Sequence, residues 1–279
     1  MDRLLPARDA PGSRSELCVR LARDACEIAM AQQLRFSVFY EELKASPDAA
    51  SAQSRRDADR FDEFCDHLIV VRRMPQDERG RFNVDDGEMV GTYRLLRQSV
   101  AERNGGFYTQ GEFDIAPLLA AKPELTFLEL GRSCVLKQYR TKPVVELLWQ
   151  GIWNYVRRHQ LDVMLGCASL EGVDPAAHAP ILDFLARNCA APPEWSVRAL
   201  PGCYVEMKSN SAAALDAKTA LKALPPLIKG YLRLGCYIGE GAVIDRQFNT
   251  TDVLIILPVS SINPRYFAHF GRPDEAVTC

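Results

Sequence analysis

The segment ELGRSCVLKQYRTKPV, residues 129–144, combines charged side chains with the pattern of a strand, a turn and a helix start. A helix that begins directly after a strand offers free backbone N–H groups and a positive dipole end, which attract phosphate. Positive charge around this helix start comes from Lys137, Arg140 and Lys142, and Thr141 or Lys142 precedes the helix as its cap. The segment predicts a seat for the phosphate of a pantetheine arm, with a solvated basic loop as the alternative.

Glu129 and Arg132 stand on either side of Gly131 in an otherwise apolar run. A carboxylate in such a run is partly desolvated, which raises its pKa toward the range of a general base. Glu129 is therefore a candidate for removing the proton of an amine nucleophile. The competing interpretation is an ion pair between Glu129 and Arg132 that only stabilises the strand.

Acidic residues gather at two further places. Asp59, Asp62 and Asp66 precede an apolar run, and Asp245 and Asp252 flank a turn near the C-terminus. Carboxylates at the end of a strand can bind the cationic groups of an amino acid. Acidic runs are also common as solvated loop surfaces, so both interpretations stay open.

A covalent nucleophile and a metal centre are not expected. Cys167 and Ser169 occur in GCAS, without the GxSxG pattern of a nucleophile elbow. The nine cysteines and four histidines show no spacing typical of a metal site. We therefore expect no metal and no permanently bound cofactor.

The hydrophobic pattern predicts the elements that position these residues. Strands are expected at 17–21, 67–72, 89–96, 125–136, 162–168, 242–248 and 252–259. Helices are expected from Asp24 to Leu43, from Pro143 in its first turn through Tyr155, at 180–188, at 223–234 and after Pro264, with a polar loop at 45–60. Gly131 within its strand predicts a bulge or a close backbone approach.

Strands and helices alternate, yet several strand pairs are joined by short turns. This combination predicts an α/β (α+β) fold with a mixed central sheet flanked by helices. Residues 1–15 are expected to form a flexible N-terminal arm, and residues 16–279 a single domain.

Composition excludes some functional classes. The net charge of −2 does not favour nucleic acid as a partner. Apolar runs are shorter than the roughly 20 residues of a membrane helix, and the first 15 residues lack the apolar core of a signal peptide. The sequence predicts a cytoplasmic protein.

Long blocks of the chain resemble the L-ornithine Nα-acyltransferases of ornithine-lipid biosynthesis. The blocks are ELGRSCVLKQYRTKPVVELLWQGIWNYV, DVMLGCASLEGVDP, LPPLIKGYLRLGCYIGEGAVIDRQFNTTDVLIILPV, RYFAHFG, LRFSVFYEEL, FDEFCDHLIV and GTYRLL, within about residues 17 to 271. The resemblance implies a fold like that of GCN5-related (GNAT) acetyltransferases and a relation to acyl-homoserine-lactone synthases. It also implies transfer of a 3-hydroxyacyl group from acyl carrier protein to the α-amino group of L-ornithine, which gives lyso-ornithine lipid.

The resemblance also suggests site residues. The catalytic candidates are Glu129 and Arg132, and the substrate-binding candidates are Arg35, Phe39, Asp59, Asp62, Asp66, Arg94 and Ser169. The candidates for the phosphopantetheine arm and its carrier are Lys137, Arg140, Thr141 and Lys142. The loop QYRTKP lacks the glycines with which GNAT enzymes bind the pyrophosphate of coenzyme A, which favours a donor with a single phosphate, the phosphopantetheine of acyl carrier protein.

Three alternatives stay open. The protein could be an acyl-homoserine-lactone synthase, or an acyltransferase for another amino acid such as lysine or glutamine. A non-catalytic, haemolysin-like membrane-associated protein belongs to a different class. A lipid product must reach a bilayer, so peripheral contact with the inner membrane is a further expectation.

Overall fold

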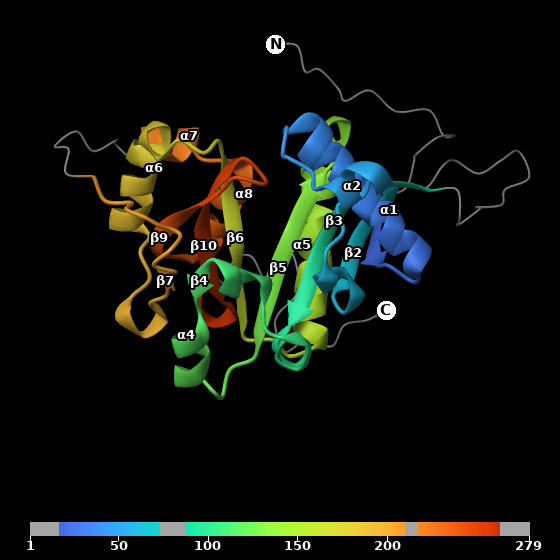
Figure 1. The fold of residues 1–279 in the computed structure, drawn as a ribbon. Coiled ribbons are helices and arrows are strands. Elements are labelled where there is room, and N and C mark those ends of the chain that lie inside the picture. The colour runs from blue at the N-terminus through green and yellow to red at the C-terminus, as the bar shows by residue number, and fades with distance from the viewer. Residues whose placement is uncertain (1–16, 73–86, 210–216, 263–279) are drawn as a thin grey trace, which may run out of the picture.

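The computed structural model describes residues 17–72, 87–209 and 217–262. Their strands form a ten-stranded sheet in the order β1-β2-β3-β5-β6-β10-β9-β7-β4, with β8 paired to β9 (Figure 1). The strands are β1 (Leu17–Leu21), β2 (Asp66–Arg72), β3 (Glu88–Arg97), β4 (Phe113–Asp114), β5 (Phe127–Val135), β6 (Val163–Glu171), β7 (Arg198–Ala199), β8 (Tyr204–Val205), β9 (Tyr237–Asp245) and β10 (Thr250–Pro258). Antiparallel pairs dominate, but β5 runs parallel to β6 and β7 parallel to β9, so the predicted mixed sheet is confirmed.

The sheet opens in its middle, between β5 and β6. The two strands are paired only from Phe127 opposite Val163 to Glu129 opposite Leu165. Beyond that point β5 continues along β3, whereas β6 continues along β10. The two strands therefore diverge like the arms of a V (Figure 1). At the apex Gly166 allows the closest approach, since a Cβ there would lie 2.3 Å from the carbonyl oxygen of Leu130.

Helices pack on both faces of the sheet. The helices are α1 (Ala25–Phe36), α2 (Ala49–Ser54), α3 (Gln98–Ala101), α4 (Ala116–Ala121), α5 (Lys142–Arg158), α6 (Pro175–Asn188), α7 (Ala217–Ala223) and α8 (Pro226–Leu234). Strand β2 shows how the faces divide, because its side chains alternate. Leu68 and Val70 pack in the core that contains α5, whereas Ile69 and Val71 pack against α1.

The N-terminal helical region departs from the predicted single helix. Its α-helical part begins after Asp24, whose side chain accepts the backbone N–H of Glu27, and ends at Phe36. A π-helical turn, Ser37–Glu42, follows. Such turns are rare and often lie at functional sites. The predicted loop at 45–60 contains α2, which Asp48 caps by accepting the backbone N–H of Ser51.

Other boundaries also differ from the prediction. Helix α6 begins at Pro175 rather than Pro180, because Asp174 caps it by accepting the backbone N–H of Ala176. The helix predicted at 223–234 corresponds to α8, which begins three residues later at Pro226, and α7, which was not predicted, ends at Ala223. The two helices are separate because Pro225 and Pro226 lack the N–H groups that a continuous helix needs. Strand β9 begins five residues earlier than predicted, at Tyr237.

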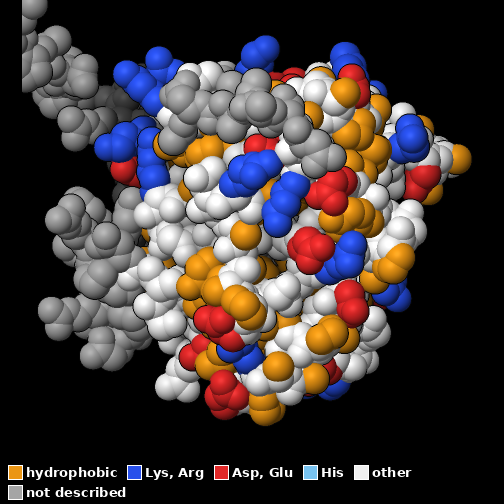
Figure 2. Space-filling model, turned by 90° about the vertical axis from the view of Figure 1, so that its left-hand side faces the viewer, with side chains coloured by type: hydrophobic (Ala, Val, Ile, Leu, Met, Phe, Trp, Pro, Cys, Tyr) orange, Lys and Arg blue, Asp and Glu red, His pale blue; other side chains and the backbone are white. Residues whose placement is uncertain are grey.

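Two expectations, the arm at residues 1–15 and the helix after Pro264, lie outside the described residues. No described helix is both long and apolar enough to cross a membrane. On the side of the molecule formed by α6, β7 and β9, acidic and basic side chains lie among hydrophobic ones (Figure 2). Neither sign gathers there into one large area.

Candidate functional site

The V between β5 and β6 contains a pocket that is lined from both faces of the sheet. Leu130 and Ala168 reach it from the core that holds α5, and Leu227 reaches it from α8. Glu129 and Cys167 line it from the opposite face, because the alternation of a strand places them there. The opening thus joins the two faces at the point where the strands separate.

A β-bulge in β5 brings the two charged residues of this strand to one face. In a regular strand Glu129 and Arg132 would point to opposite faces, since they are three positions apart. The pairing of β3 with β5 shifts register between Thr92 and Arg94, so β5 carries one extra residue, and Arg132 adopts a left-handed backbone with φ of 49°. Its guanidinium then stacks over the ring of Tyr108, whose backbone N–H binds Glu129. The bulge or close backbone approach predicted at Gly131 is thus a bulge that begins one residue later, because Gly131 itself pairs with Arg94.

Glu129 is buried at the apex of the V and is held in place by backbone donors. Its two carboxylate oxygens accept the backbone N–H groups of Tyr108 at 2.9 Å and Thr109 at 2.6 Å. Burial raises the pKa of Glu129, although these hydrogen bonds act in the opposite direction. The structure thus gives Glu129 partners other than Arg132, and the proposed ion pair between them is not formed.

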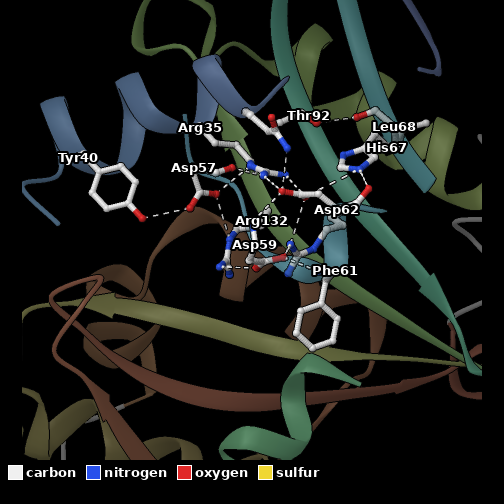
Figure 3. A network of polar contacts seen from close by, with 12 residues as sticks. Arg35, Tyr40, Asp57, Asp59, Phe61, Asp62, His67, Leu68, Thr92 and Arg132 are labelled. Atoms are coloured by element: carbon white, nitrogen blue, oxygen red, sulfur yellow. Dashed lines mark hydrogen bonds and ion pairs between the residues drawn. The ribbon is translucent and has the colours of Figure 1, made fainter. Parts of the chain in front are cut away.

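Three arginines and three aspartates form a buried network behind the pocket (Figure 3). Arg35 of α1 binds Asp62 through two hydrogen bonds, of 2.9 and 2.7 Å, and lies 2.8 Å from Oδ2 of Asp57. Arg94 of β3 binds Asp59 at 2.6 Å. Arg132 binds both Asp57 at 3.1 Å and Asp59 at 3.0 Å. We call these six residues the arginine–aspartate network.

The charges of this network balance one another. Burial opposes the ionised form of Asp62, but the ion pairs with Arg35 and Arg94 hold its pKa well below the ordinary range. Burial likewise opposes the charged form of Arg132, yet Asp57 and Asp59 raise its pKa further. Arg94 and Arg132 therefore remain charged, and both reach the pocket.

A second charged group lies on the side of the pocket formed by β9 and β10. Carboxylate oxygens of Glu112, Asp245 and Asp252 lie within 4.8 Å of one another. Burial and the nearby Asp252 raise the pKa of Glu112 to about 7, and burial raises the pKa of Asp252 to about 6. We call these residues the carboxylate cluster. Their donor set and spacing also suit a cation.

The structure separates the candidates from the sequence into three places. Phe39, Arg94, Glu129, Arg132 and Ser169 line the pocket. Arg35, Asp59 and Asp62 lie behind it in the arginine–aspartate network. Asp66 lies elsewhere, with its carboxylate 2.5 Å from the hydroxyl of Tyr155 and 3.6 Å from Arg97.

Two of the basic residues around the start of α5, Arg140 and Lys142, have acidic partners of their own. Arg140 makes two hydrogen bonds, of 2.7 and 2.8 Å, to Glu42 of the π-helical turn. Lys142 lies 3.3 Å from Glu146 and is largely exposed. Thr141 is the N-cap of α5, but its side chain makes no capping hydrogen bond. Lys137 begins a short 3-10 helix, Lys137–Tyr139, directly after β5.

Sequence reasoning missed two acidic residues of the site. Glu112 lies between strands in GEFDI, and Asp57 stands two residues before Asp59. A carboxylate next to the aromatic Phe113 could have indicated Glu112, and the repeated spacing of aspartates could have indicated Asp57. Cys167, by contrast, is no nucleophile in this setting, because burial raises the pKa of its thiol well above the ordinary value.

Comparison with known proteins gives one consistent result. The acetyltransferase (GNAT) domain family matches residues 34–150. An L-ornithine N(alpha)-acyltransferase of Agrobacterium fabrum is 51% identical over 95% of this chain and 89% of its own length. A protein of the same name from Brucella abortus is also 51% identical, over 93% of this chain and 90% of its own.

A solved structure, FeeM, an N-acyl amino acid synthase from uncultured soil microbes, covers 90% of this chain and 98% of its own at 12% identity, with a TM-score of 0.48. The sequence identities to the two bacterial relatives extend over almost the whole chain, well beyond the GNAT match. The chain is an acyltransferase with a GNAT domain and belongs to the L-ornithine N(alpha)-acyltransferase family.

Proposed function

We propose that this enzyme transfers a 3-hydroxyacyl group from acyl carrier protein to the α-amino group of L-ornithine, which yields lyso-ornithine lipid. The observation that carries the proposal is the pocket in the V between β5 and β6, with the buried carboxylate of Glu129 at its apex. The family supports ornithine as the acceptor. The opening through the sheet supports an extended thioester donor.

The chemistry needs one direct step. The neutral α-amine attacks the thioester carbonyl carbon, the new C–N bond forms and the C–S bond breaks. The amine loses one proton to a base, and the departing sulfur takes up one proton to become the thiol of the carrier. Backbone N–H groups at the divergence of β5 and β6, which lack a partner strand across the opening, are suited to stabilise the oxyanion.

Glu129 is the proposed base, acting directly or through a water molecule. Its raised pKa suits proton uptake, and two backbone N–H groups fix its orientation. Arg132 is fixed beside it by Asp57 and Asp59, which makes its position independent of substrate. A guanidinium held in this way can bind the α-carboxylate of the acceptor.

The proposed carrier contact is the start of α5. The open end of β5 leads directly to Lys137, Arg140, Thr141 and Lys142, and this loop offers no glycine-rich pyrophosphate nest. Acyl carrier protein presents a single phosphate on an acidic surface, which suits exposed basic residues. Because the product is a lipid, the proposal also includes peripheral contact of the enzyme with a membrane.

The test is thiol release from 3-hydroxyacyl carrier protein with and without ornithine, with mass spectrometry of the product. Ornithine-dependent release with an Nα-amide is the expected result. Release only with S-adenosylmethionine would assign a lactone synthase instead. Glu129→Gln should lower kcat roughly 100-fold or more, as expected for loss of a general base. The matched control is Glu124→Gln, an exposed carboxylate shortly before β5; equal rates of both variants would remove Glu129 from this role.

A further inference from the structure

The carboxylate cluster is assembled from three separate segments of the chain. Glu112 precedes β4, Asp245 ends β9 and Asp252 lies in β10 opposite Ser169 of β6. Asp245 is held by the turn between β9 and β10, because its Oδ1 accepts the backbone N–H groups of Gln247 and Phe248. Glu112 accepts the thiol of Cys167 at 3.1 Å. These contacts orient two of the three carboxylates, and oxygens of all three lie within 4.8 Å of one another.

No cation in the part of the chain that the structure describes neutralises this cluster. Among the described residues, no lysine, arginine or histidine forms an ion pair with any of its three members. Arg132 is the cation whose charge acts on both Glu112 and Asp252, but its guanidinium is bound to Asp57 and Asp59. The cluster therefore offers negative charge that nothing in the described structure balances.

An unpartnered atom points to a ligand at this place. Asp252 is only 6% exposed, and its Oδ1 atom has no hydrogen-bond partner within the described residues. Asp252 and Asp245 both line the pocket of the V. A buried carboxylate oxygen without a donor is costly, so its retention beside the pocket indicates a donor that arrives with the substrate.

We propose that Glu112, Asp245 and Asp252 form the subsite that binds the side-chain ammonium group of a dibasic amino acid acceptor. An ammonium carries three N–H donors and one positive charge, which matches three carboxylates that surround one point. The inference deepens the proposed function and depends on it, because it assigns the δ-ammonium of ornithine to one site of the same pocket.

The subsite also explains the choice between the two amino groups of ornithine. An ammonium held by carboxylates stays protonated and has no lone pair with which to attack a thioester. The α-amine remains near Glu129, where it can lose its proton. The cluster thus directs acylation to the α-position by keeping the other nitrogen charged.

Calorimetric titration of L-ornithine and of norvaline tests this directly, because norvaline has the carbon chain of ornithine without the δ-amine. The wild-type protein should bind ornithine at least about 10-fold more tightly than norvaline. Asp252→Asn keeps the shape and removes the charge, so the affinity for ornithine should fall on the order of 10- to 100-fold while that for norvaline stays within about 2-fold. Glu112→Gln should act in the same direction, and Asp114→Asn, an exposed carboxylate of β4, is the control.

Other results would overturn the assignment. Equal losses for ornithine and norvaline would give the cluster a structural role, as would unchanged affinity for both in Asp252→Asn. Loss of ornithine binding in a chelator, with recovery on adding Mg²⁺, would assign a metal instead. Binding is measured without an acyl donor and is therefore independent of acyl transfer. If the protein selected ornithine over norvaline as expected but transferred no acyl group, the proposed function would be refuted and the subsite would stand.

Discussion

The arginine–aspartate network and the carboxylate cluster use the same kind of acidic side chain in opposite ways. In the network, Asp57, Asp59 and Asp62 each contact at least one buried arginine. In the cluster, the partners of Glu112 and Asp245 are neutral, a thiol and two backbone amides. The pKa of Asp62 is lowered, whereas the pKa values of Glu112 and Asp252 are raised.

The contrast indicates which charges hold the protein together and which await a ligand. In a balanced buried network, the attraction between paired charges offsets much of the free energy needed to remove them from water. The contacts also fix the positions of the members. An unbalanced cluster destabilises the free protein, and a bound cation offsets that cost. On one side of the site, the arginine–aspartate network therefore provides rigidity. On the other side, the carboxylate cluster provides charge for a ligand.

Breaking the network should have the largest effect. Arg35→Met removes a fully buried cation and leaves Asp57 and Asp62 without it, so the free energy of unfolding should fall by about 3–5 kcal/mol. Urea denaturation measures this loss. Arg233→Met, at an exposed position of α8, serves as the control and should stay within about 0.5 kcal/mol. A small loss in Arg35→Met would show that the network contributes no rigidity.

The two regions should also differ in their response to pH. A carboxyl group whose pKa is raised by folding stabilises the fold at pH values below its pKa in the unfolded chain, which is about 4. This stability is lost as the pH rises through the folded pKa values, about 6 for Asp252 and about 7 for Glu112. The lowered pKa of Asp62 acts oppositely, with stability lost on acidification. Between pH 5 and pH 8, the free energy of unfolding of Glu112→Gln should therefore fall by about 2 kcal/mol less than that of the wild type.

Denaturant titrations of wild type and Glu112→Gln at the two pH values give this difference. The pKa values of His67 and His159 are lowered mainly by burial, and these histidines titrate in both proteins, so they cancel in the comparison. Around Glu112, Arg132 stays charged, and burial raises the pKa values of Cys167 and Tyr108. An identical pH dependence in both proteins would contradict the raised pKa of Glu112.

The exposed pair of Arg140 and Glu42 provides the smallest effect on stability. Arg140→Glu combined with Lys142→Glu should change the free energy of unfolding by less than about 1 kcal/mol, because exposed pairs contribute little. The KM for acyl carrier protein should nevertheless rise several-fold at low salt, since steering depends on exposed charge. An unchanged KM would place the carrier contact elsewhere. Arg233→Glu combined with Lys222→Glu, at exposed positions of α8 and α7, matches the change in net charge.

Hydrophobic periodicity was sufficient to predict the central strands and α5. The apolar, β-rich run at residues 67–72 and the glycine at 131 predicted β2 and the bulge, because these signals are local. Proline pairs and side-chain caps determined the boundaries that were wrong, as at Pro225 and Asp174. Periodicity does not contain that information.

The site was only partly predictable for a different reason. Glu129 and Arg132 share one short segment, so their importance could be inferred from spacing and resemblance. The carboxylate cluster joins Glu112 to two residues more than 130 positions later, and only the sheet brings them together. Whether an acidic residue has a positively charged partner depends on such long-range contacts. The sequence around each acidic residue does not reveal this partner.

The extra residue in β5 gives the two charged side chains of this strand a shared face although they are three positions apart. Deleting Gly131 would leave Arg132 two positions after Glu129, so a regular strand would keep Arg132 and every later side chain of β5 on its present face. The left-handed backbone at Arg132 would be lost, with the chemical identity of both charged residues intact. Replacing side chains one at a time cannot separate the backbone of the bulge from the side chains that it carries, but shortening the strand by a single residue can.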